Sequence, residues 1–340
     1  MRQEDIENDP VLAATPSYPS WLAAIVLPLA EFIDDKADPR ALFTDLQEIG
    51  QGESGSVYSA CAAPSTDEGR SRPQQGLVAI KCVPLLRGRT EKMADLRREL
   101  ELTRTLRHPN LLYMERLYVD VAEENLWIGM ELMDRSLADV LAVVGEDTGS
   151  AQISEKMVAR FVWDVLLALS YIRKHHIAHR DVRSDNLLLS RSGVLKLSDF
   201  SSAVCSPSGT PKRSDPVGVI YWQAPEMRTG LYDPLKVDVW SLGATTWELA
   251  HGDPPFADVQ DMRDIFGAQL PPVRQPEAFS RSFHDFLHSC SQPAASRPDP
   301  DELLEADFVR TACPRSEIVR LLGQCRAIDE QQVLRQSNEF

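Results

Sequence analysis

The densest group of residues that could do acid–base and metal chemistry lies near the middle of the chain. It begins with His179-Arg180-Asp181, and Asn186 and Asp199 follow it. An aspartate that follows an apolar helix is well placed to accept a proton from an alcohol. Asn186 can offer a side-chain carbonyl oxygen and Asp199 a carboxylate, and together with phosphate oxygens these are the hard ligands that Mg²⁺ takes. The pattern indicates proton transfer beside a magnesium-bound phosphate.

A glycine-rich segment precedes this block, with Gly50, Gly52 and Gly55 followed by Val57. Glycine lets a backbone bend tightly and approach a phosphate chain, whose charge the exposed N–H groups can meet. A dinucleotide-binding turn would continue into a helix, whereas Val57 begins a strand-like run, and the GK[ST] ending of a Walker A loop is absent. A phosphate-covering loop between two strands and a chance turn both stay open.

Lys81 ends an apolar run that starts at Val78, so burial of its ammonium group would be costly without an anionic partner. Nucleotide phosphates and a carboxylate of the following helix are the two candidates. Glu99 is the carboxylate that we expect there, because Glu101 would point from a different face of that helix. Lys81 and Glu99 therefore extend the predicted phosphate site.

The elements that must position these groups are short strands followed by longer helices. Runs rich in Val, Ile, Tyr and Leu predict strands over 43–49, 56–61, 77–83, 111–121 and 126–132. Apolar residues at helical spacing predict helices over 89–106, 155–175, 237–251, 279–290 and 300–309. The helix over 237–251 is apolar almost all round, which predicts a buried central position. The polar stretch 62–76 is expected to be an exposed loop.

Composition limits the possible partners and compartments. The chain has 340 residues, a formal net charge of −15 and six scattered cysteines without a CxxC pair. Such an acidic chain is a poor candidate for binding nucleic acid or anionic membrane, and it would attract basic proteins. The cysteine pattern argues against a disulfide scaffold or a Cys-rich zinc site and favours a reducing, cytoplasmic location.

The most apolar run, Trp21–Ile33, contains Pro28 and is too short to span a membrane. Acidic residues precede it where a signal peptide would carry positive charge. We expect a short amphipathic helix that packs on the main domain. A segment that docks a partner is the alternative.

Over residues 43–309 the chain resembles the eukaryotic protein kinases, and locally the PAK family of Ser/Thr kinases. The resemblance is carried by IGQG (49–52), HRD (179–181), SDN (184–186), LSDF (197–200), KRS (212–214), VG (217–218), YW (221–222), APE (224–226) and VDVWSLG (237–243). The hinge segment 130–137 is more similar to a MAP kinase kinase. The implied fold class is α+β and bilobal, with a β-rich N-lobe (43–131) that has one main helix and a larger, mostly helical C-lobe (132–309). An acidic extension (1–42) and a tail (310–340) would flank it.

The resemblance also implies a role for each matching residue. ATP would be the phosphate donor, Mg²⁺ its metal ion, and a Ser or Thr hydroxyl of a protein the acceptor. Implied ATP contacts come from Gly50, Gly52, Gly55, Val57, Ala79, Lys81 paired with Glu99, the gatekeeper Met130, and the backbone of Glu131 and Met133. Asp181 would orient or deprotonate the hydroxyl, Asn186 and Asp199 would hold the metal, and Glu226 with Arg297 would form a structural ion pair.

Three residues depart from the family pattern around the predicted catalytic aspartate. Ser201 replaces the glycine of the DFG motif, whose peptide flips a Cβ atom restricts. Arg183 replaces a lysine of the catalytic loop and keeps its charge in a larger, forked form. Val219 replaces a threonine that hydrogen-bonds Asp181. A pseudokinase or weakly active ATP-binding partner is therefore the alternative to an active kinase, and a scaffold that acts through its extension is a third hypothesis.

The resemblance extends to regulation and substrate choice. Asp215 occupies the position of the activating phosphothreonine of PAK relatives, and Ser214 beside it is a candidate phosphosite. We expect Asp215 to pair with Arg180 and partly fix the activation loop, the alternative being a surface aspartate without a partner. Asp185 and Glu248 match positions that contact arginine upstream of the phosphoacceptor, which favours a basic substrate. Both could instead be simply solvated carboxylates.

Overall fold

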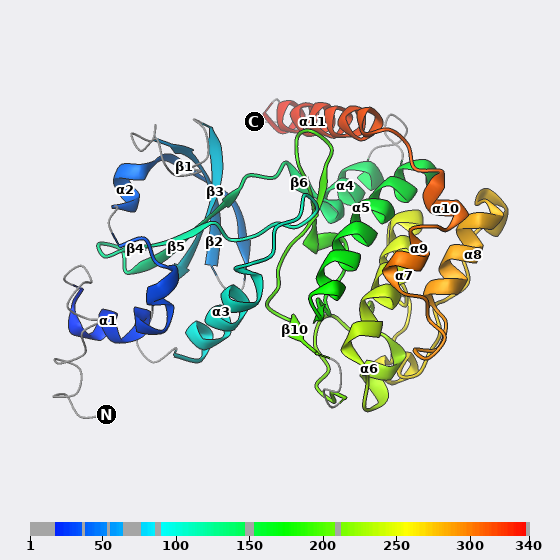
Figure 1. Cartoon of the computed structure of the whole chain (residues 1–340). Coiled ribbons are helices and arrows are strands. Elements are labelled where there is room, and N and C mark those ends of the chain that lie inside the picture. The colour runs from blue at the N-terminus through cyan, green and yellow to red at the C-terminus, as the bar shows by residue number, and fades with distance from the viewer. Residues whose placement is uncertain are drawn as a thin grey trace. The chain divides into compact units, whose positions relative to one another are not determined.

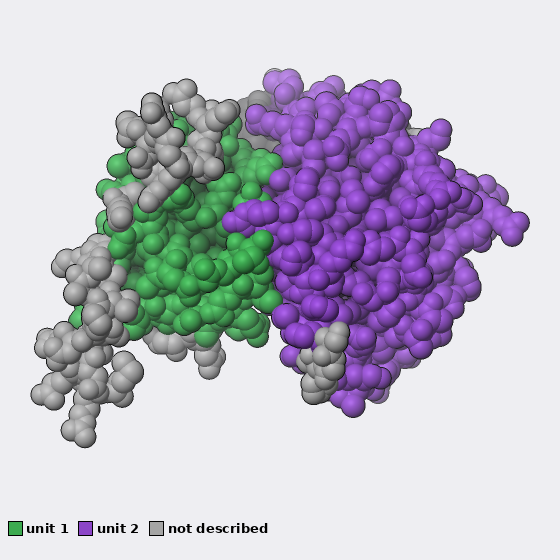
Figure 2. Space-filling model, in the orientation of Figure 1, with its two compact units in different colours: residues 1–105, 113–132 green, residues 106–112, 133–340 purple. Residues whose placement is uncertain are grey.

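The computed structural model describes residues 18–35, 38–52, 55–63, 76–85, 90–146, 153–207 and 212–337. The chain divides into two compact units, which Figure 2 colours separately. Unit 1 takes in the chain up to Thr105 together with Tyr113–Leu132, and unit 2 takes in Leu106–Leu112 together with Met133–Phe340. No helix among the described ranges has both the length and the apolar character that a membrane crossing requires.

Unit 1 is built on a five-stranded antiparallel sheet and one main helix (Figure 1). The strands are β1 (Phe43–Gly52), β2 (Gly55–Ala62), β3 (Leu77–Pro84), β4 (Arg116–Asp120) and β5 (Asn125–Glu131), and their order in the sheet is β1-β2-β3-β5-β4. The main helix is α3 (Thr90–Thr103). The predicted β-rich lobe is thereby confirmed. The strand expected over 111–121 is shorter, because Leu111 belongs to unit 2 and pairs there with Leu197 in an isolated bridge. Most of the predicted loop over 62–76 lies outside the described residues.

The N-terminal apolar run folds onto unit 1. It forms α1 (Ser20–Val26) and the 3₁₀ helix η3 (Leu27–Phe32), and a short α2 (Pro39–Leu42) leads into β1. Leu22 and Leu29 are fully buried in a cluster with Leu100 of α3 and Ile128 of β5. This confirms the expected helix that packs on the main domain, since burial of apolar surface removes it from water.

Unit 2 is mostly helical. Its helices are α4 (Leu137–Glu146), α5 (Glu155–Lys174), α6 (Pro225–Thr229), α7 (Val237–His251), α8 (Arg281–Cys290), α9 (Pro300–Leu303), α10 (Asp307–Arg310) and α11 (Arg315–Ser337). Short 3₁₀ helices lie at η4 (Ser184–Asn186), η5 (Pro234–Lys236), η6 (Met262–Ile265) and η7 (Pro276–Ala278). The small strands are β6 (Arg135–Ser136), β7 (Ile177–Ala178), β8 (Leu187–Leu189), β9 (Leu195–Leu197) and β10 (Val204–Cys205).

Helix α7 is buried over almost its whole length, as its all-round apolar pattern predicts. The predicted helix over 279–290 starts at Arg281, because the Ser280 hydroxyl accepts a hydrogen bond from the N–H of Phe283 and caps it. The predicted helix over 300–309 is two helices, α9 and α10, with Ala306 at the N-cap position of the second.

The residues expected to be a tail beyond 309 form a substantial part of unit 2. Helix α11 contacts α4 and α5, and Ile318, Leu321, Leu322 and Cys325 on it are fully buried. Its Arg326 pairs at 2.9 Å with the carboxylate of Asp134, which is itself 7% exposed. The core of unit 2 therefore extends well past the last predicted helix.

Candidate active site

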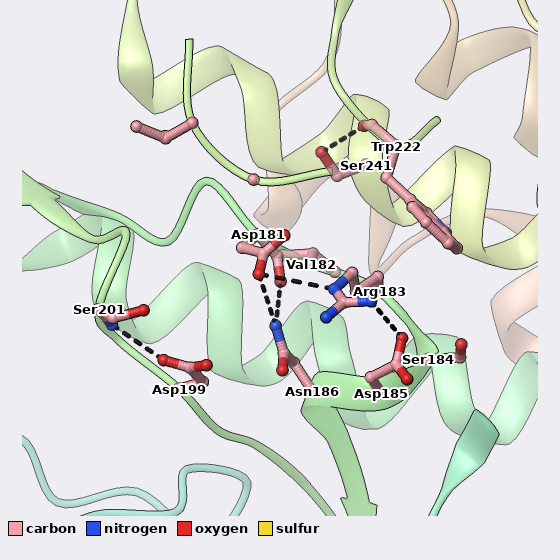
Figure 3. A network of polar contacts seen from close by, with 12 residues as sticks. Asp181, Val182, Arg183, Ser184, Asp185, Asn186, Asp199, Ser201, Trp222 and Ser241 are labelled. Carbon is pink, nitrogen blue, oxygen red and sulfur yellow. Dashed lines mark hydrogen bonds and ion pairs between the residues drawn. The ribbon is translucent and has the colours of Figure 1, made fainter. Parts of the chain in front are cut away.

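The β8–β9 hairpin brings the two predicted metal ligands together. Leu187 pairs with Leu197 in antiparallel register, so Asn186 and Ser198 lie opposite each other at the open end of the hairpin. The N–H and the hydroxyl of Ser198 donate to the backbone oxygen of Asn186 at 2.9 and 3.0 Å. Asp199 follows Ser198, so it comes next to the residue that lies opposite Asn186. Figure 3 shows both side chains. Residues that are far apart in sequence are held side by side by a short ladder.

Helix α7 holds the loop that precedes η4 through the carboxylate of Asp238. The N–H groups of His179 and Arg180 donate to the two carboxylate oxygens of Asp238 at 2.8 and 2.7 Å. Asp238 is buried, and this burial raises its pKa while the two N–H donors act in the opposite direction. The ring of His179 contacts the backbone oxygen of Ser198 at 2.9 Å, which ties the loop to β9 as well.

Asp181 is the residue that this loop presents. Its Oδ2 accepts a hydrogen bond from Nδ2 of Asn186 at 2.9 Å, and Nε of Arg183 lies 3.6 Å from the same oxygen. The Asn186 amide also donates to the backbone oxygen of Asp181 at 2.9 Å (Figure 3). These contacts orient a carboxylate that is mostly shielded, with 14% of its side chain exposed.

The donor chemistry fits magnesium. Because Nδ2 of Asn186 is used toward Asp181, its Oδ1 is the amide atom left to act as a ligand. Asp199 adds a carboxylate, whose Oδ1 accepts the N–H of Ser201 at 3.2 Å. The backbone of Asp199 has φ of 60°, so the turn that aims this side chain adopts the left-handed region. An amide oxygen, a carboxylate and phosphate oxygens are a set that Mg²⁺ accepts.

Arg183 is held by three neighbours. Its Nη1 pairs with Asp185, and its guanidinium lies 5.7 Å from the centre of the Trp222 ring. With Asp181 also nearby, the side chain is confined beside the carboxylate instead of extending into solvent. A planar guanidinium suits such stacked and forked contacts better than a lysine ammonium does.

The predicted pairing of Asp215 with Arg180 is confirmed. Nη1 of Arg180 lies 3.0 Å from Oδ2 of Asp215 and donates to the Tyr232 hydroxyl at 2.9 Å. Arg213 binds the same carboxylate through two further hydrogen bonds of 2.6 and 2.7 Å. The pKa of Asp215 is held below its ordinary value, chiefly by the bond to Arg213 and also by Arg180. Ser214 beside it is exposed, and its role as a phosphosite stays a prediction.

Sequence reasoning missed Arg213 and Tyr232. Tyr232 donates to the backbone oxygen of Asp215 at 2.8 Å, and Arg213 pairs with Tyr232 in an isolated antiparallel bridge. Arg213 belongs to the KRS motif and stands two residues from Asp215, and both facts could have marked it as a partner. Tyr232 lies far along the chain, and nothing in the sequence marks it as a partner.

Glu248 requires a correction, because its carboxylate does not face solvent. Its two oxygens accept the Ser184 hydroxyl at 2.6 Å and the Trp222 indole N–H at 2.9 Å, and the residue is 5% exposed. Burial raises the pKa of Glu248 to about 7. Glu248 therefore holds Ser184 and Trp222 in place, and its carboxylate is not free to bind a basic substrate. Asp185 is half-exposed, but it pairs with Arg183.

In unit 1, strand register gathers the residues predicted for ATP. Val57 pairs with Lys81, and Ala79 pairs with Met130. Residues two apart on a strand and directly opposite across an antiparallel pair share one face of a sheet, so these four side chains lie on the same face. The backbone of Glu131 pairs with Val78 at the end of β5.

The glycine-rich segment joins β1 to β2, with Gly52 opposite Gly55. The two residues between them lie outside the described residues. Gly55 has φ of 146°, and a Cβ atom there would lie 2.0 Å from the backbone oxygen of Cys82, so only glycine fits. A Cβ on Gly50 would meet no atom within 4 Å. Packing thus explains why residue 55 must be glycine, but it does not require glycine at residue 50.

The predicted pair of Lys81 with Glu99 stays a prediction. Arg97 and Arg98 of α3 form ion pairs with Glu31, Glu101 and Asp95, and Arg104, just after the helix, pairs with Glu31. The backbone oxygen of Glu99 accepts the Thr103 hydroxyl at 2.8 Å.

The structural ion pair between Glu226 and Arg297 is confirmed. Nη1 and Nη2 of Arg297 lie 2.6 and 3.2 Å from the two carboxylate oxygens of Glu226. Arg297 is 2% exposed, also donates to the backbone oxygen of Lys236, and lies over the Trp240 ring. This fork geometry ties α6 to the core of unit 2.

Comparisons with known proteins agree with this geometry. The protein kinase domain family matches residues 43–309. Serine/threonine-protein kinase pakC of Dictyostelium discoideum is 32% identical over 298 residues, which cover 86% of this chain and 59% of that protein. Serine/threonine-protein kinase TAO2 of Homo sapiens is 35% identical over 300 residues, which cover 86% of this chain and 22% of that protein. Serine/threonine-protein kinase CLA4 of Eremothecium gossypii is 32% identical over 301 residues, 84% of this chain and 38% of that protein.

The chain thus spans between about a fifth and three fifths of the length of these relatives. The match of the family covers most of the chain, and it includes the sheet of unit 1 and the catalytic loop of unit 2. The resemblance drawn from the sequence motifs is confirmed. This chain belongs to the protein kinase domain family.

Proposed function

We propose that the protein transfers the γ-phosphate of ATP to a Ser or Thr hydroxyl of a protein substrate. The observation that carries the proposal is the contact of Asp181 with Asn186, which the β8–β9 hairpin holds beside Asp199. This arrangement supports a proton acceptor next to a metal-binding pair, which is what in-line phosphoryl transfer needs.

Each residue has a distinct part in the proposed reaction. The carboxylate of Asp181 orients the substrate hydroxyl and accepts its proton as the oxygen attacks phosphorus. Arg183, held beside Asp181, meets the negative charge of the transferred group. Bound magnesium would neutralise phosphate charge, and Asn186 and Asp199 would hold it. Lys81 of unit 1 would contact the phosphates. Adenine would be contacted by Val57, Ala79, Met130 and the backbone of Glu131 from unit 1, and by the backbone of Met133 from unit 2.

The proposed substrate carries basic residues near the phosphoacceptor. The net charge of −15 and the half-exposed carboxylate of Asp185 support this preference. Glu248 makes no contribution to it, because its carboxylate is buried. A peptide series with Arg or Glu upstream of one serine tests the preference, and equal kcat/KM for the two peptides would contradict it.

The test of the function is transfer of radiolabelled phosphate from ATP to an arginine-rich protein. Wild type should label the protein, and Asp181→Asn should lower the rate by at least about a hundredfold, since a positioned proton acceptor contributes on this order. Asp253→Asn is the matched control, because Asp253 is an exposed aspartate that pairs with Arg274 in the same unit. Nucleotide-dependent stabilisation without any transfer would instead indicate a pseudokinase.

A further inference from the structure

The strongest unexplained feature near Asp181 is the side chain of Gln223. It is 9% exposed, and its Nε2 donates to the backbone oxygens of Val217 and Gly218, both at 3.0 Å. None of the motifs that carry the family resemblance includes it. A buried amide that makes two bonds to one short segment needs a reason.

Gly218 lies directly against the catalytic aspartate. Its φ is 76°, and a Cβ atom there would lie 2.8 Å from Oδ1 of Asp181 and 2.8 Å from the backbone oxygen of Arg180. The Gly218 backbone therefore lies close to Oδ1 of Asp181, whereas Asn186 bonds the other oxygen, Oδ2. A shift of the Gly218 backbone would therefore change the space available to Oδ1 of Asp181.

The side chains of residues 217–219 cannot hydrogen-bond the Asp181 carboxylate, because the three residues are Val, Gly and Val. Val219 has no polar side-chain group, so it cannot donate to Asp181. Gly218 is an exposed residue, and its backbone oxygen is one of the two acceptors of the Gln223 amide. The two bonds satisfy the buried amide of Gln223, and they also hold residues 217 and 218 in place.

Gln223 stands on a rigid base. The backbone oxygen of Trp222 accepts the Ser241 hydroxyl at 2.9 Å, as Figure 3 shows, and the Trp222 indole bonds Glu248. Ala224 on the other side is fully buried. The position of Gln223 is thus set by α7, and its amide transmits that position to Gly218.

We infer that Gln223 is a positioning residue for phosphoryl transfer, which acts on Asp181 through Gly218. The inference rests on the proposed function, because it assigns how the proton acceptor of that reaction is kept in place. Loss of the two donors leaves Gly218 and the Asp181 carboxylate with more freedom. The effect falls on the chemical step and leaves nucleotide binding unchanged.

The test compares Gln223→Met, which keeps the length but has no donor, with Gln223→Lys, which restores an N–H donor group. We expect Gln223→Met to lower kcat about tenfold, as the loss of two neutral hydrogen bonds allows, with KM for ATP and Tm unchanged. Hydrogen exchange of residues 216–221 should become faster. Gln223→Lys should recover most of kcat.

The matched control is Gln292→Met, because Nε2 of Gln292 also makes two contacts, to the ring and the backbone oxygen of His288, away from Asp181. Unchanged kcat in Gln223→Met, or a loss that Gln223→Lys leaves unrepaired, would overturn the inference. So would a parallel fall of Tm and of ATP affinity. If Gln223→Met does not fold, Gln223→Leu, which also lacks a donor and carries no charge, replaces it with the same expectations. Absence of transfer in wild type would refute the proposed function itself. Hydrogen exchange of residues 216–221 would still show whether Gln223 holds this segment in place.

Discussion

At the scale of single residues, two carboxylates outside the reaction hold the middle and the end of the segment that leads from Asp199 to α6. Asp215 is bound by Arg180 and Arg213, close to the start of that segment's second half. Glu248 accepts hydrogen bonds from the Trp222 indole N–H, near the end of the segment, and from the Ser184 hydroxyl. One carboxylate is kept charged by arginines and the other is made hard to charge by burial, so they respond to pH in opposite ways.

Replacement of Asp215 should weaken catalysis without abolishing it. Asp215→Asn removes the charge that Arg180 and Arg213 share, and a partly exposed ion pair of this kind allows a loss of about two- to fivefold in kcat. Because the folded-state pKa of Asp215 is depressed, its contribution is present above the ordinary aspartate pKa and is lost as the pH falls below it.

Steady-state kinetics after phosphatase treatment is the measurement for Asp215. Treated wild type should keep its activity, because the aspartate supplies the charge without phosphorylation. Asp261→Asn is the control, since Asp261 pairs with Arg263 at the same two-residue separation on an exposed turn. Complete loss of wild-type activity on dephosphorylation would show that the pair does not fix the loop.

Glu248 should make the protein less stable as the pH rises. Its pKa is raised from 4.5 to about 7, so between these values the folded protein keeps a proton that the unfolded chain has released. The free energy of unfolding then falls across this interval, by about 3 kcal/mol at most. Glu248→Gln removes the titration while its oxygen still accepts the Trp222 indole and its amide can donate to Ser184.

Urea denaturation at pH 5 and pH 8 measures this effect. The difference in free energy of unfolding between the two pH values should shrink by about 2–3 kcal/mol in Glu248→Gln. Glu305→Gln, at a side chain that is 76% exposed, should leave the difference as in wild type. An identical pH dependence of wild type and Glu248→Gln would rule out the raised pKa.

At the scale of elements, the site depends on short segments whose partners are distant in sequence. The β8–β9 hairpin aligns Asn186 with Ser198, and α7 supplies Asp238 to the catalytic loop. Helix α11 extends the same core, with its buried face on α4 and α5 and with Arg326 on Asp134. The residues predicted as a tail therefore help to stabilise unit 2, which carries Asp181, Asn186 and Asp199.

Truncation of one buried leucine of α11 should destabilise unit 2. Leu322→Ala removes a fully buried side chain and should lower the free energy of unfolding by about 2–5 kcal/mol. Leu334→Ala on the same helix, at a residue that is 63% exposed, should change it by less than about 0.5 kcal/mol. Chemical denaturation distinguishes the two, and equal effects would mean that α11 does not pack as described.

At the scale of the whole molecule, the sequence predicts what local spacing determines. Asp181, Asn186 and Asp199 are recognisable because each stands in a short motif, and the helices over 155–175 and 237–251 follow from their apolar periodicity. The pairing of Asp215 with Arg180 could be predicted because Arg180 belongs to the HRD motif and Asp215 occupies the position of the phosphothreonine in the relatives that the chain resembles.

Contacts between distant segments without motifs could not be predicted. The burial of Glu248 follows from Trp222 and Ser184 folding over it, and the bonds of Gln223 depend on the path of residues 217–218. Helix α11 has apolar residues at helical spacing, but its length and its place in the core become visible only once α4 and α5 are assembled.

The central claim is that unit 2 holds the magnesium of bound ATP through Asn186 and Asp199. Calorimetric titration of ATP into the folded protein, with and without Mg²⁺, tests it most directly. We predict saturable heat that depends on Mg²⁺ in wild type, and an affinity at least about tenfold lower in Asp199→Asn, as expected when a ligand to a metal ion loses its charge. No heat in folded wild type, or equal heat without Mg²⁺, would contradict the account.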